Sequence, residues 1–143
     1  MMKPTRKQAK EAGSTRYRSK LCAKHPELKG ERHTSSGTCV GCLHQNVATR
    51  REKRKSEIIE HYSNGMMCCA HCGIDDLEVL TIDHIEQNGA EHRRQVGIRG
   101  KGTDGINLRP WLKRNGYPPG YRVLCFNCNV KAWFAHQRKQ RAN

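Results

Sequence analysis

Three short stretches decide the fold of this chain: Cys69-Ala-His-Cys72, then Leu80-Thr-Ile-Asp83-His84-Ile85, and last Val123-Leu-Cys125-Phe-Asn-Cys128-Asn129. The first and last are C-x2-C knuckles, and two such knuckles supply the four thiolates of one tetrahedral zinc site. The middle stretch alternates apolar and polar residues, which predicts a strand. A zinc ion bound by Cys69, Cys72, Cys125 and Cys128 would hold this strand close to Asn129.

The three polar side chains that this arrangement gathers are a carboxylate, an imidazole and a carboxamide: Asp83, His84 and Asn129. Oxygen donors such as those of Asp83 and Asn129 suit one hard divalent cation, Mg²⁺ or Mn²⁺. An imidazole with an ordinary pKa of about 6.5 can take a proton from water near neutral pH. Because successive side chains of a straight strand face opposite ways, Asp83 and His84 can share a site only if the strand twists out into the following loop.

A second set of metal-ligating residues lies nearer the N-terminus, where a C-x2-H knuckle precedes a C-x2-C knuckle. The spacing predicts a second structural zinc with the ligands Cys22, His25, Cys39 and Cys42. His33 and His44 remain alternative histidine ligands. Cys68 is expected to be a free thiol, because only Cys69 has the x2 spacing to Cys72.

The composition predicts a thin apolar core. Of 143 residues, 35% are hydrophobic and 6% aromatic, and chains with so little core usually need staples, for which the eight cysteines are the candidates. No apolar run is long enough for a signal peptide or a membrane span. We therefore expect an intracellular protein of a host-cell cytoplasm, not a secreted one, in which cysteines bind metal rather than each other.

The charge indicates a polyanionic partner. Twenty-seven Lys and Arg against 13 Asp and Glu give a net charge of +14. DNA is the expected partner, because neutralising phosphates releases counterions, whereas a membrane is not, since no apolar face accompanies the charge. A basic run from Arg50 to Lys55 suits a helix that lies over a DNA backbone, with Arg50, Arg51 and Arg54 as candidate phosphate contacts.

The domain organisation that we expect is a small, zinc-stabilised α+β protein. It comprises a disordered basic arm (1–20), an N-terminal zinc-finger module (21–45), a basic linker helix (46–63) that stops at Asn64-Gly65, and a C-terminal domain (64–143). Within the last, we expect a strand at 77–85, a Gly-rich mobile loop at 86–103, a short helix at 104–115 capped by Asp104, a strand at 121–124 and a closing helix at 127–137. Trp111 and Trp133 are expected in the core.

From Cys69 to Lys131 the chain resembles the HNH endonucleases, whose core is a treble-clef-like ββα-metal finger. The resemblance rests on Ile82-Asp83-His84, His92-Arg93, Trp111-Leu-Lys113, Tyr117-Pro-Pro-Gly-Tyr121 and Val123-Leu-Cys125-Phe-Asn-Cys128-Asn129. It is similar to small bacteriophage HNH proteins, including homing endonucleases, and the split knuckles resemble recombination endonuclease VII.

The resemblance implies a metal-dependent endonuclease that hydrolyses DNA phosphodiesters and leaves 5′-phosphate and 3′-hydroxyl ends. His84 would be the general base, and Asp83 and Asn129 would bind the catalytic Mg²⁺ or Mn²⁺. His92, Arg93, Arg94 and Lys131 would contact phosphate. A zinc-stabilised DNA-binding protein without significant catalysis is the alternative.

The chain departs from the family at the middle position of the motif. Many members carry an Asn about five residues before the second knuckle, where this chain has Gly120. Asn107 is a possible substitute, equally suited to starting a helix. The oligomeric state stays open between monomer and homodimer, since one such site cuts one strand and a double-strand break needs two sites or two events.

Overall fold

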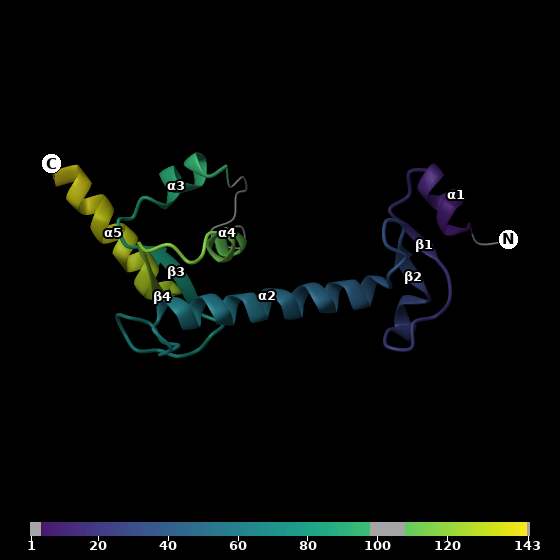
Figure 1. Cartoon of the computed structure of the whole chain (residues 1–143), viewed down its shortest axis with the longest axis horizontal. Coiled ribbons are helices and arrows are strands. Elements are labelled where there is room, and N and C mark those ends of the chain that lie inside the picture. The colour runs from purple at the N-terminus through teal and green to yellow at the C-terminus, as the bar shows by residue number, and fades with distance from the viewer. Residues whose placement is uncertain (1–3, 98–107, 143) are drawn as a thin grey trace. The chain divides into compact units, whose positions relative to one another are not determined.

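The structure, a computed structural model, describes residues 4–97 and 108–142. It is a small α+β protein with two antiparallel two-stranded sheets, β1–β2 and β3–β4 (Figure 1). The chain divides into two compact units, residues 1–52 and 53–143. The boundary falls inside helix α2, Val40–Tyr62.

Unit 1 contains helix α1 (Arg6–Glu11), strand β1 (Arg16–Arg18), the 3-10 turn η1 (Pro26–Leu28) and strand β2 (Glu31–His33). The expectation of a disordered arm over 1–20 is therefore wrong for its described part. Thr5 and Gln8 form a capping box that starts α1. The Arg6 Nε donates to the Thr34 carbonyl at 2.9 Å, and β1 pairs with β2, so contacts distant in sequence order this segment.

Helix α2 begins six residues before the expected linker helix, directly after Cys39. It ends where the sequence predicts: Asn64 and Gly65 have φ angles of 52° and 80°, a left-handed conformation that stops a helix. The Gly65 N–H donates to the Glu60 carbonyl at 2.8 Å, which satisfies one of the last carbonyls of α2.

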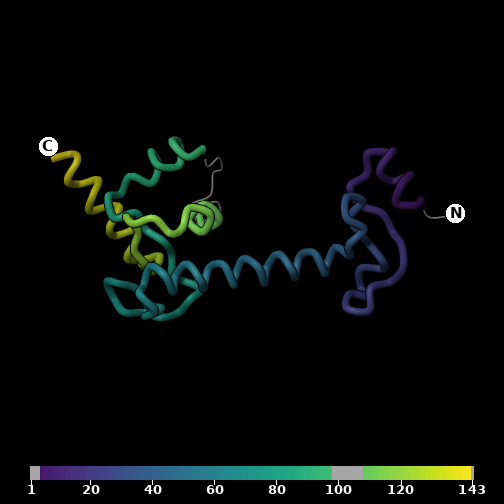
Figure 2. Tube along the Cα trace, in the orientation of Figure 1, coloured from purple at the N-terminus to yellow at the C-terminus, as the bar shows by residue number. Residues whose placement is uncertain are grey.

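Unit 2 is built on strands β3 (Leu80–His84) and β4 (Tyr121–Cys125), followed at once by helix α5 (Phe126–Ala142). The register pairs Leu80 with Cys125 and His84 with Tyr121. Figure 2 shows the segment between α2 and β3 folding back along the end of α2. Both predicted strands are present, and α5 is longer than the closing helix expected over 127–137.

Among the described residues, the core of unit 2 is small and comprises two clusters, which share Tyr62 and Ile82 as partly buried neighbours. Ile59 packs with Cys69, Leu80, Val123, Leu124 and Cys125. Ile58 packs with Leu108 and Leu112, and Trp111 lies against this second cluster. Trp133, expected in the core, is instead 48% exposed on α5.

The segment expected as a mobile loop over 86–103 contains helix α3 (Gly89–Gln95), while residues 98–103 lie outside the described part. Helix α4 spans Leu108–Arg114, so the helix expected over 104–115 is shown from residue 108 onward. The proposed cap Asp104 and the alternative Asn107 lie outside the described residues. Gly116, with φ of 67°, follows the end of α4 as predicted.

The packing predicts that replacing an apolar side chain by Ala destabilises unit 2 by an amount that depends on how deeply that side chain is buried. Leu124 is fully buried, and Leu124→Ala should lower the free energy of unfolding of unit 2 by about 3 kcal/mol through lost apolar burial and a cavity. Met66 is 71% exposed, and Met66→Ala should change it by less than about 0.5 kcal/mol. Urea unfolding of both variants measures the difference. Equal losses would show that the core assignment is wrong.

Candidate functional site

The first metal-ligating cluster lies in unit 1 and contains the four residues that the spacing predicts. The ligand atoms of Cys22, His25, Cys39 and Cys42 all lie within 4.8 Å of one another. His25 Nδ1 is 3.8 Å from Cys22 Sγ, 3.8 Å from Cys39 Sγ and 3.4 Å from Cys42 Sγ. The structure thus selects His25 over the alternatives His33 and His44, which are outside the cluster.

Gly41 makes room for the imidazole of this cluster. A Cβ atom at position 41 would lie 2.5 Å from two ring carbons of His25. Such contacts are shorter than Cβ atoms show, so the second of the two residues between the knuckle cysteines, position 41, must lack a side chain here. The sequence contains this glycine, but only the folded arrangement shows what it accommodates.

The second cluster lies in unit 2 and joins three segments of the chain. The Sγ atoms of Cys69, Cys72, Cys125 and Cys128 also lie within 4.8 Å of one another, and Cys72 and Cys125 are 3.7 Å apart. The N–H groups of His71 and Cys128 point at the sulfurs of Cys69 and Cys125, each at 3.4 Å. Cys68 belongs to neither cluster, as expected.

One thiol in each cluster is prepared to lose its proton. The His25 side chain and then the Lys24 backbone lower the pKa of Cys22 to about 6. Burial raises the pKa of Cys69, but hydrogen bonds from the backbone of Cys125, Cys72 and His71 outweigh it and bring the pKa to about 6. Thiolates are the form that binds metal.

Both clusters could hold a structural zinc ion. With Zn–S bonds of about 2.3 Å, tetrahedral geometry places neighbouring sulfurs about 3.8 Å apart. The measured separations of 3.6 Å between Cys22 and Cys42 and 3.7 Å between Cys72 and Cys125 fit that value. The donor sets, Cys₃His and Cys₄, are typical of structural rather than catalytic zinc.

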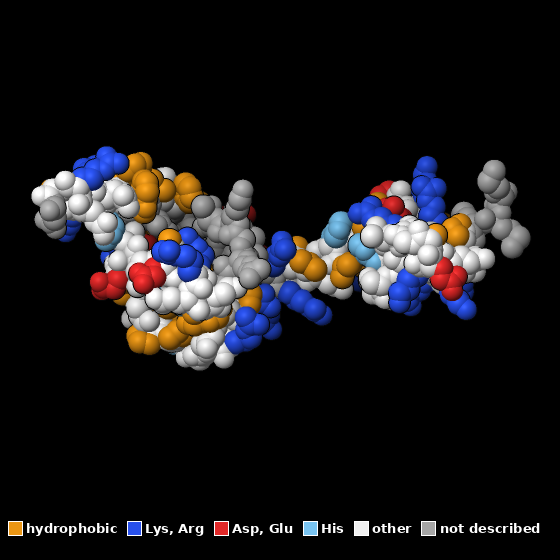
Figure 3. Space-filling model, turned by 90° about the horizontal axis from the view of Figure 1, so that it is seen from above, with side chains coloured by type: hydrophobic (Ala, Val, Ile, Leu, Met, Phe, Trp, Pro, Cys, Tyr) orange, Lys and Arg blue, Asp and Glu red, His pale blue; other side chains and the backbone are white. Residues whose placement is uncertain are grey.

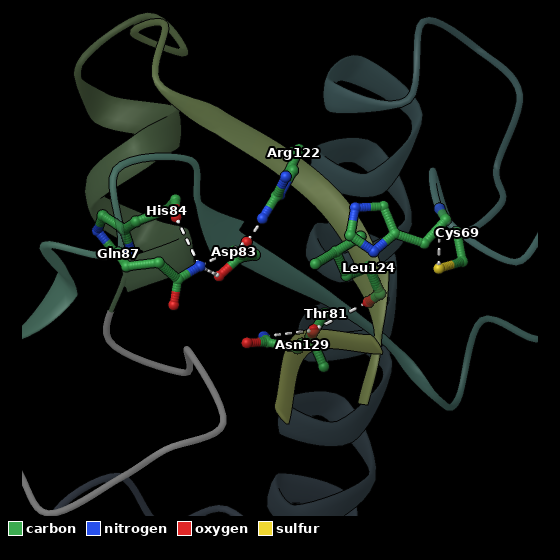
Figure 4. Close-up of polar contacts among 9 residues, drawn as sticks. Cys69, Thr81, Asp83, His84, Gln87, Arg122, Leu124 and Asn129 are labelled. Carbon is green, nitrogen blue, oxygen red and sulfur yellow. Dashed lines mark hydrogen bonds and ion pairs between the residues drawn. The ribbon is translucent and has the colours of Figure 1, made fainter. Parts of the chain in front are cut away.

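Asp83, the predicted carboxylate ligand of a divalent cation, is only 5% exposed. Its Oδ2 accepts a hydrogen bond from Arg122 Nε at 2.8 Å, across the β3–β4 pair (Figure 4). Gln87 Nε2 donates to Oδ1 at 2.9 Å and to Oδ2 at 3.1 Å. Arg122 and Gln87 therefore compensate the buried charge, and no local sequence pattern indicates either partner.

Asn129 lies in the first turn of α5 and is joined to β3 through Thr81. Its Nδ2 donates to Thr81 Oγ1 at 3.0 Å, and that hydroxyl donates to the Leu124 carbonyl at 2.9 Å. Thr81 and Asp83 are two residues apart on β3 and so face the same side. Figure 4 shows the amide oxygen of Asn129 turned away from Thr81, on the side where Asp83 lies.

The oxygen donors of Asp83 and Asn129 are of the type that Mg²⁺ and Mn²⁺ prefer, and Mg²⁺ is commonly bound by one or two protein oxygens with water completing the shell. Among the described residues, none donates to the amide oxygen of Asn129. The carboxylate of Asp83, in contrast, is engaged by Arg122 and Gln87. The donor set thus fits a hard cation, provided that the partners of Asp83 give way.

His84 lies in an aromatic cluster on the other side of β3. Its ring is 4.8 Å from the ring of Tyr121, and its Nε2 is 3.3 Å from Nδ1 of His92. A Cβ at Gly89 would lie 2.9 Å from His84 Nδ1, so α3 can approach this closely only with glycine there. Burial, and then His92 and Arg93, lower the pKa of His84 to about 4 against an opposing contribution from Asp83.

The twist that would bring Asp83 and His84 onto one side of the strand is absent. β3 stays paired through His84 opposite Tyr121, and the Ile85 N–H continues the pairing by donating to the Gly120 carbonyl at 3.0 Å. Regular pairing keeps the alternation of side chains, so Asp83 and His84 point to opposite faces. The structure brings Asp83 and Asn129 to one face of β3, whereas His84, which directly follows Asp83 in sequence, faces the other side.

The candidate phosphate contacts differ in their surroundings. His92 packs edge-on against Trp111, with ring centres 4.6 Å apart, and thus belongs to the aromatic cluster. Arg93, on α3, lies near enough to influence His84. The remaining candidates, Arg50, Arg51, Arg54, Arg94 and Lys131, are exposed except for Arg54, which is half-buried.

The chain matches no protein-family model, no curated protein and no solved structure. Within residues 4–97 and 108–142, the helices are all too short or too polar to cross a membrane. A function for this chain must therefore be inferred from the geometry of the two clusters and of β3, β4 and α5.

The clusters predict two zinc ions per chain with separable effects. Cys125→Ser should lose one equivalent and unfold unit 2, because zinc binding contributes an apparent folding energy of about 10–16 kcal/mol in small metal domains. Cys22→Ser should lose the other equivalent and leave unit 2 folded. Metal analysis by mass spectrometry and circular dichroism measure both effects.

Cys68→Ser is the matched control, since Cys68 neighbours the second cluster without joining it. It should retain two equivalents. A chain that keeps both zinc ions after Cys125→Ser, or loses one after Cys68→Ser, would contradict the assignment.

Proposed function

We propose that this chain is a metal-dependent DNA endonuclease of the HNH type, which hydrolyses phosphodiester bonds and leaves 5′-phosphate and 3′-hydroxyl ends. In this proposal β3, β4 and α5 form a ββα-metal finger. Its structural zinc ligands are Cys69, Cys72, Cys125 and Cys128.

The observation that carries the proposal is the hydrogen bond from Asn129 to Thr81, which holds a helix carboxamide on the face of β3 that also carries Asp83. Asn129 directly follows Cys128 of the Cys₄ cluster. When bound there, Mg²⁺ or Mn²⁺ would stabilise the developing charge on the phosphate and the leaving 3′ oxygen. A protein that only binds DNA needs no such pair of oxygen donors.

His84 is the proposed general base. Its pKa, lowered to about 4 chiefly by burial, keeps the imidazole neutral at physiological pH, with a nitrogen lone pair that can accept a proton, and also makes it a weaker base than an ordinary histidine. Its Cα lies about 3.8 Å from that of Asp83, as for any consecutive residues. β3 has a partner on one edge only within the described residues. A phosphate that approaches the unpaired edge of β3 near its end could thus contact both Asp83 on one face and His84 on the other.

A groove next to this hairpin supports an anionic ligand. It has a volume of about 580 Å³ and is lined by Thr81, Phe126, Lys55 and Arg109, among others. Burial, and then the charge of Arg109, lower the pKa of Lys55, while Asp76 and Glu78 act in the opposite direction. Lys55 and Arg109 would attract a phosphate to the groove, and Glu78 in the same lining opposes them.

The distribution of charge supports DNA as the substrate. Lys and Arg side chains are spread over the visible face of each unit in Figure 3. The net charge of +14 would give strong, salt-dependent binding to a phosphate backbone irrespective of base sequence.

The alternative, a zinc-stabilised DNA-binding protein without significant catalysis, is favoured by two observations. Asp83 is already paired with Arg122, and β3 holds His84 on the opposite face. The cleavage experiment decides between the two functions, since both predict binding to DNA.

Cleavage of supercoiled plasmid should require Mg²⁺ or Mn²⁺ and stop with EDTA. His84→Ala should lower the rate by about 10²–10⁴-fold, the usual contribution of a positioned base, while DNA affinity stays within about twofold. Asp83→Ala and Asn129→Ala should abolish the response to the divalent cation. Gel analysis of nicked and linear plasmid, with gel-shift titration, measures cleavage and binding.

His136→Ala is the matched control for the base, because His136 hydrogen-bonds to Gln140 on α5 and lies outside both metal-ligating clusters and the aromatic cluster around His84. It should cleave at the wild-type rate. Full activity of His84→Ala would refute the base, and binding without cleavage under every cation would establish the alternative function.

The arginines of α2 predict a change in salt dependence. Replacing Arg50, Arg51 and Arg54 by Gln should reduce the slope of log affinity against log salt by about 0.9 for each phosphate that the variant no longer neutralises. Fluorescence anisotropy with a duplex at several salt concentrations measures the slope. An unchanged slope would mean that this part of α2 does not contact phosphate.

A further inference from the structure

We infer that Arg122 is an internal counter-cation of Asp83, which competes with the divalent cation for the carboxylate and thereby sets how much metal the site requires. This inference rests on the proposed function, because it assumes that Asp83 is a ligand of that cation. No sequence pattern indicates this role for Arg122, which precedes the apolar run Val123–Leu124.

The burial of Asp83 creates the need for a positive partner. Asp83 is 5% exposed, and an ionised carboxylate out of water is strongly unfavourable unless a positive charge or several donors compensate it. In a hairpin whose cation site is filled, the divalent ion would provide that compensation. In the structure, the positive charge next to Asp83 is that of Arg122, whose Nε lies 2.8 Å from Oδ2.

The position of Arg122 matches the path of a cation. Arg122 is the direct cross-strand neighbour of Asp83 in the β3–β4 register, so their side chains project from the same face. Asn129, the other proposed ligand, is held on that face through Thr81. The guanidinium therefore approaches the carboxylate from the face to which a cation must bind.

The pair of Arg122 and Asp83 can open. The Arg122 side chain is 29% exposed, so its guanidinium can move into water without a large change of the backbone. Gln87 can still donate to Asp83, since it is neutral and also bonds to the His84 carbonyl at 3.2 Å. Displacement of Arg122 then exchanges one positive partner for another, and the two bind Asp83 in competition.

Removing the competitor should tighten cation binding. Arg122→Gln keeps a hydrogen-bond donor but no charge, and should raise the affinity of the zinc-loaded full chain for Mn²⁺ by about tenfold. Arg122→Lys keeps the charge but lacks the guanidinium fork, and it should raise the Mn²⁺ affinity by a smaller factor. It is the variant to use if Arg122→Gln folds poorly. Electron paramagnetic resonance of free Mn²⁺ measures the affinity without DNA or turnover.

Arg16→Gln is the matched control. Arg16 also forms an ion pair with a carboxylate near a two-stranded sheet, Glu31 at 3.4 Å, but in unit 1. The substitution removes the same charge from the chain and should leave Mn²⁺ affinity unchanged. Asp83→Asn should abolish the binding in every background.

The outcomes separate the inference from the proposed function. If Mn²⁺ binding depends on Asp83 but is unchanged or weaker in the folded Arg122 variants, Arg122 is not a competitor and the cation site stands. If Arg16→Gln raised the Mn²⁺ affinity as much as the Arg122 variants do, the effect would come from the lower net charge of the chain, and the inference would be overturned. If no binding depends on Asp83 in any variant, the proposed cation site itself is wrong.

Discussion

The packing of unit 2 depends on the convergence of four cysteine sulfurs. Cys69 and Cys72 belong to an irregular segment after α2, Cys125 ends β4, and Cys128 lies in α5. These segments have little apolar surface to hold them together, since the core around Ile59 contains only six buried residues among those described, two of them cysteines of this cluster. A metal ion bound by the four thiolates would join the segment after α2, the end of β4 and the start of α5, which the small core alone holds together weakly. It would also fix the start of α5, and with it the position of Asn129 relative to β3.

The same constraint explains which features could be predicted from the sequence. Ligand spacing is a local property that follows from tetrahedral geometry, so the four residues of each cluster that could hold zinc were correctly predicted. Gly65 and Gly116 mark helix ends because of their backbone freedom. The order and type of α2, β3, β4 and α5 also follow from local patterns. Contacts between distant segments could not be predicted this way. Arg6 orders residues 5–11 by bonding to the Thr34 carbonyl, and no pattern within 1–20 indicates that partner.

The candidate site likewise has features that the sequence predicts and features that depend on contacts between distant segments. The residue types of Asp83, His84 and Asn129 indicate cation binding and proton transfer, but their relative orientation depends on the pairing of β3 with β4. That pairing extends past His84 to Ile85, which separates the imidazole from the carboxylate. The cross-strand register also places Arg122 opposite Asp83, whereas the sequence separates them by 39 positions. A divalent cation could replace Arg122 as the positive partner of the buried Asp83 carboxylate. The proposed function and the role inferred for Arg122 both depend on this replacement.

The proposed function depends most on whether Asp83 and Asn129 form one cation site next to the Cys₄ cluster. The most direct test is a crystal structure of the zinc- and Mn²⁺-loaded chain, with anomalous diffraction recorded at energies that distinguish the two metals. We predict zinc at both cysteine clusters and manganese between the Asp83 carboxylate and the Asn129 amide oxygen, with Arg122 moved away from Asp83. Manganese at other places, with the Arg122–Asp83 pair intact, would contradict the proposal.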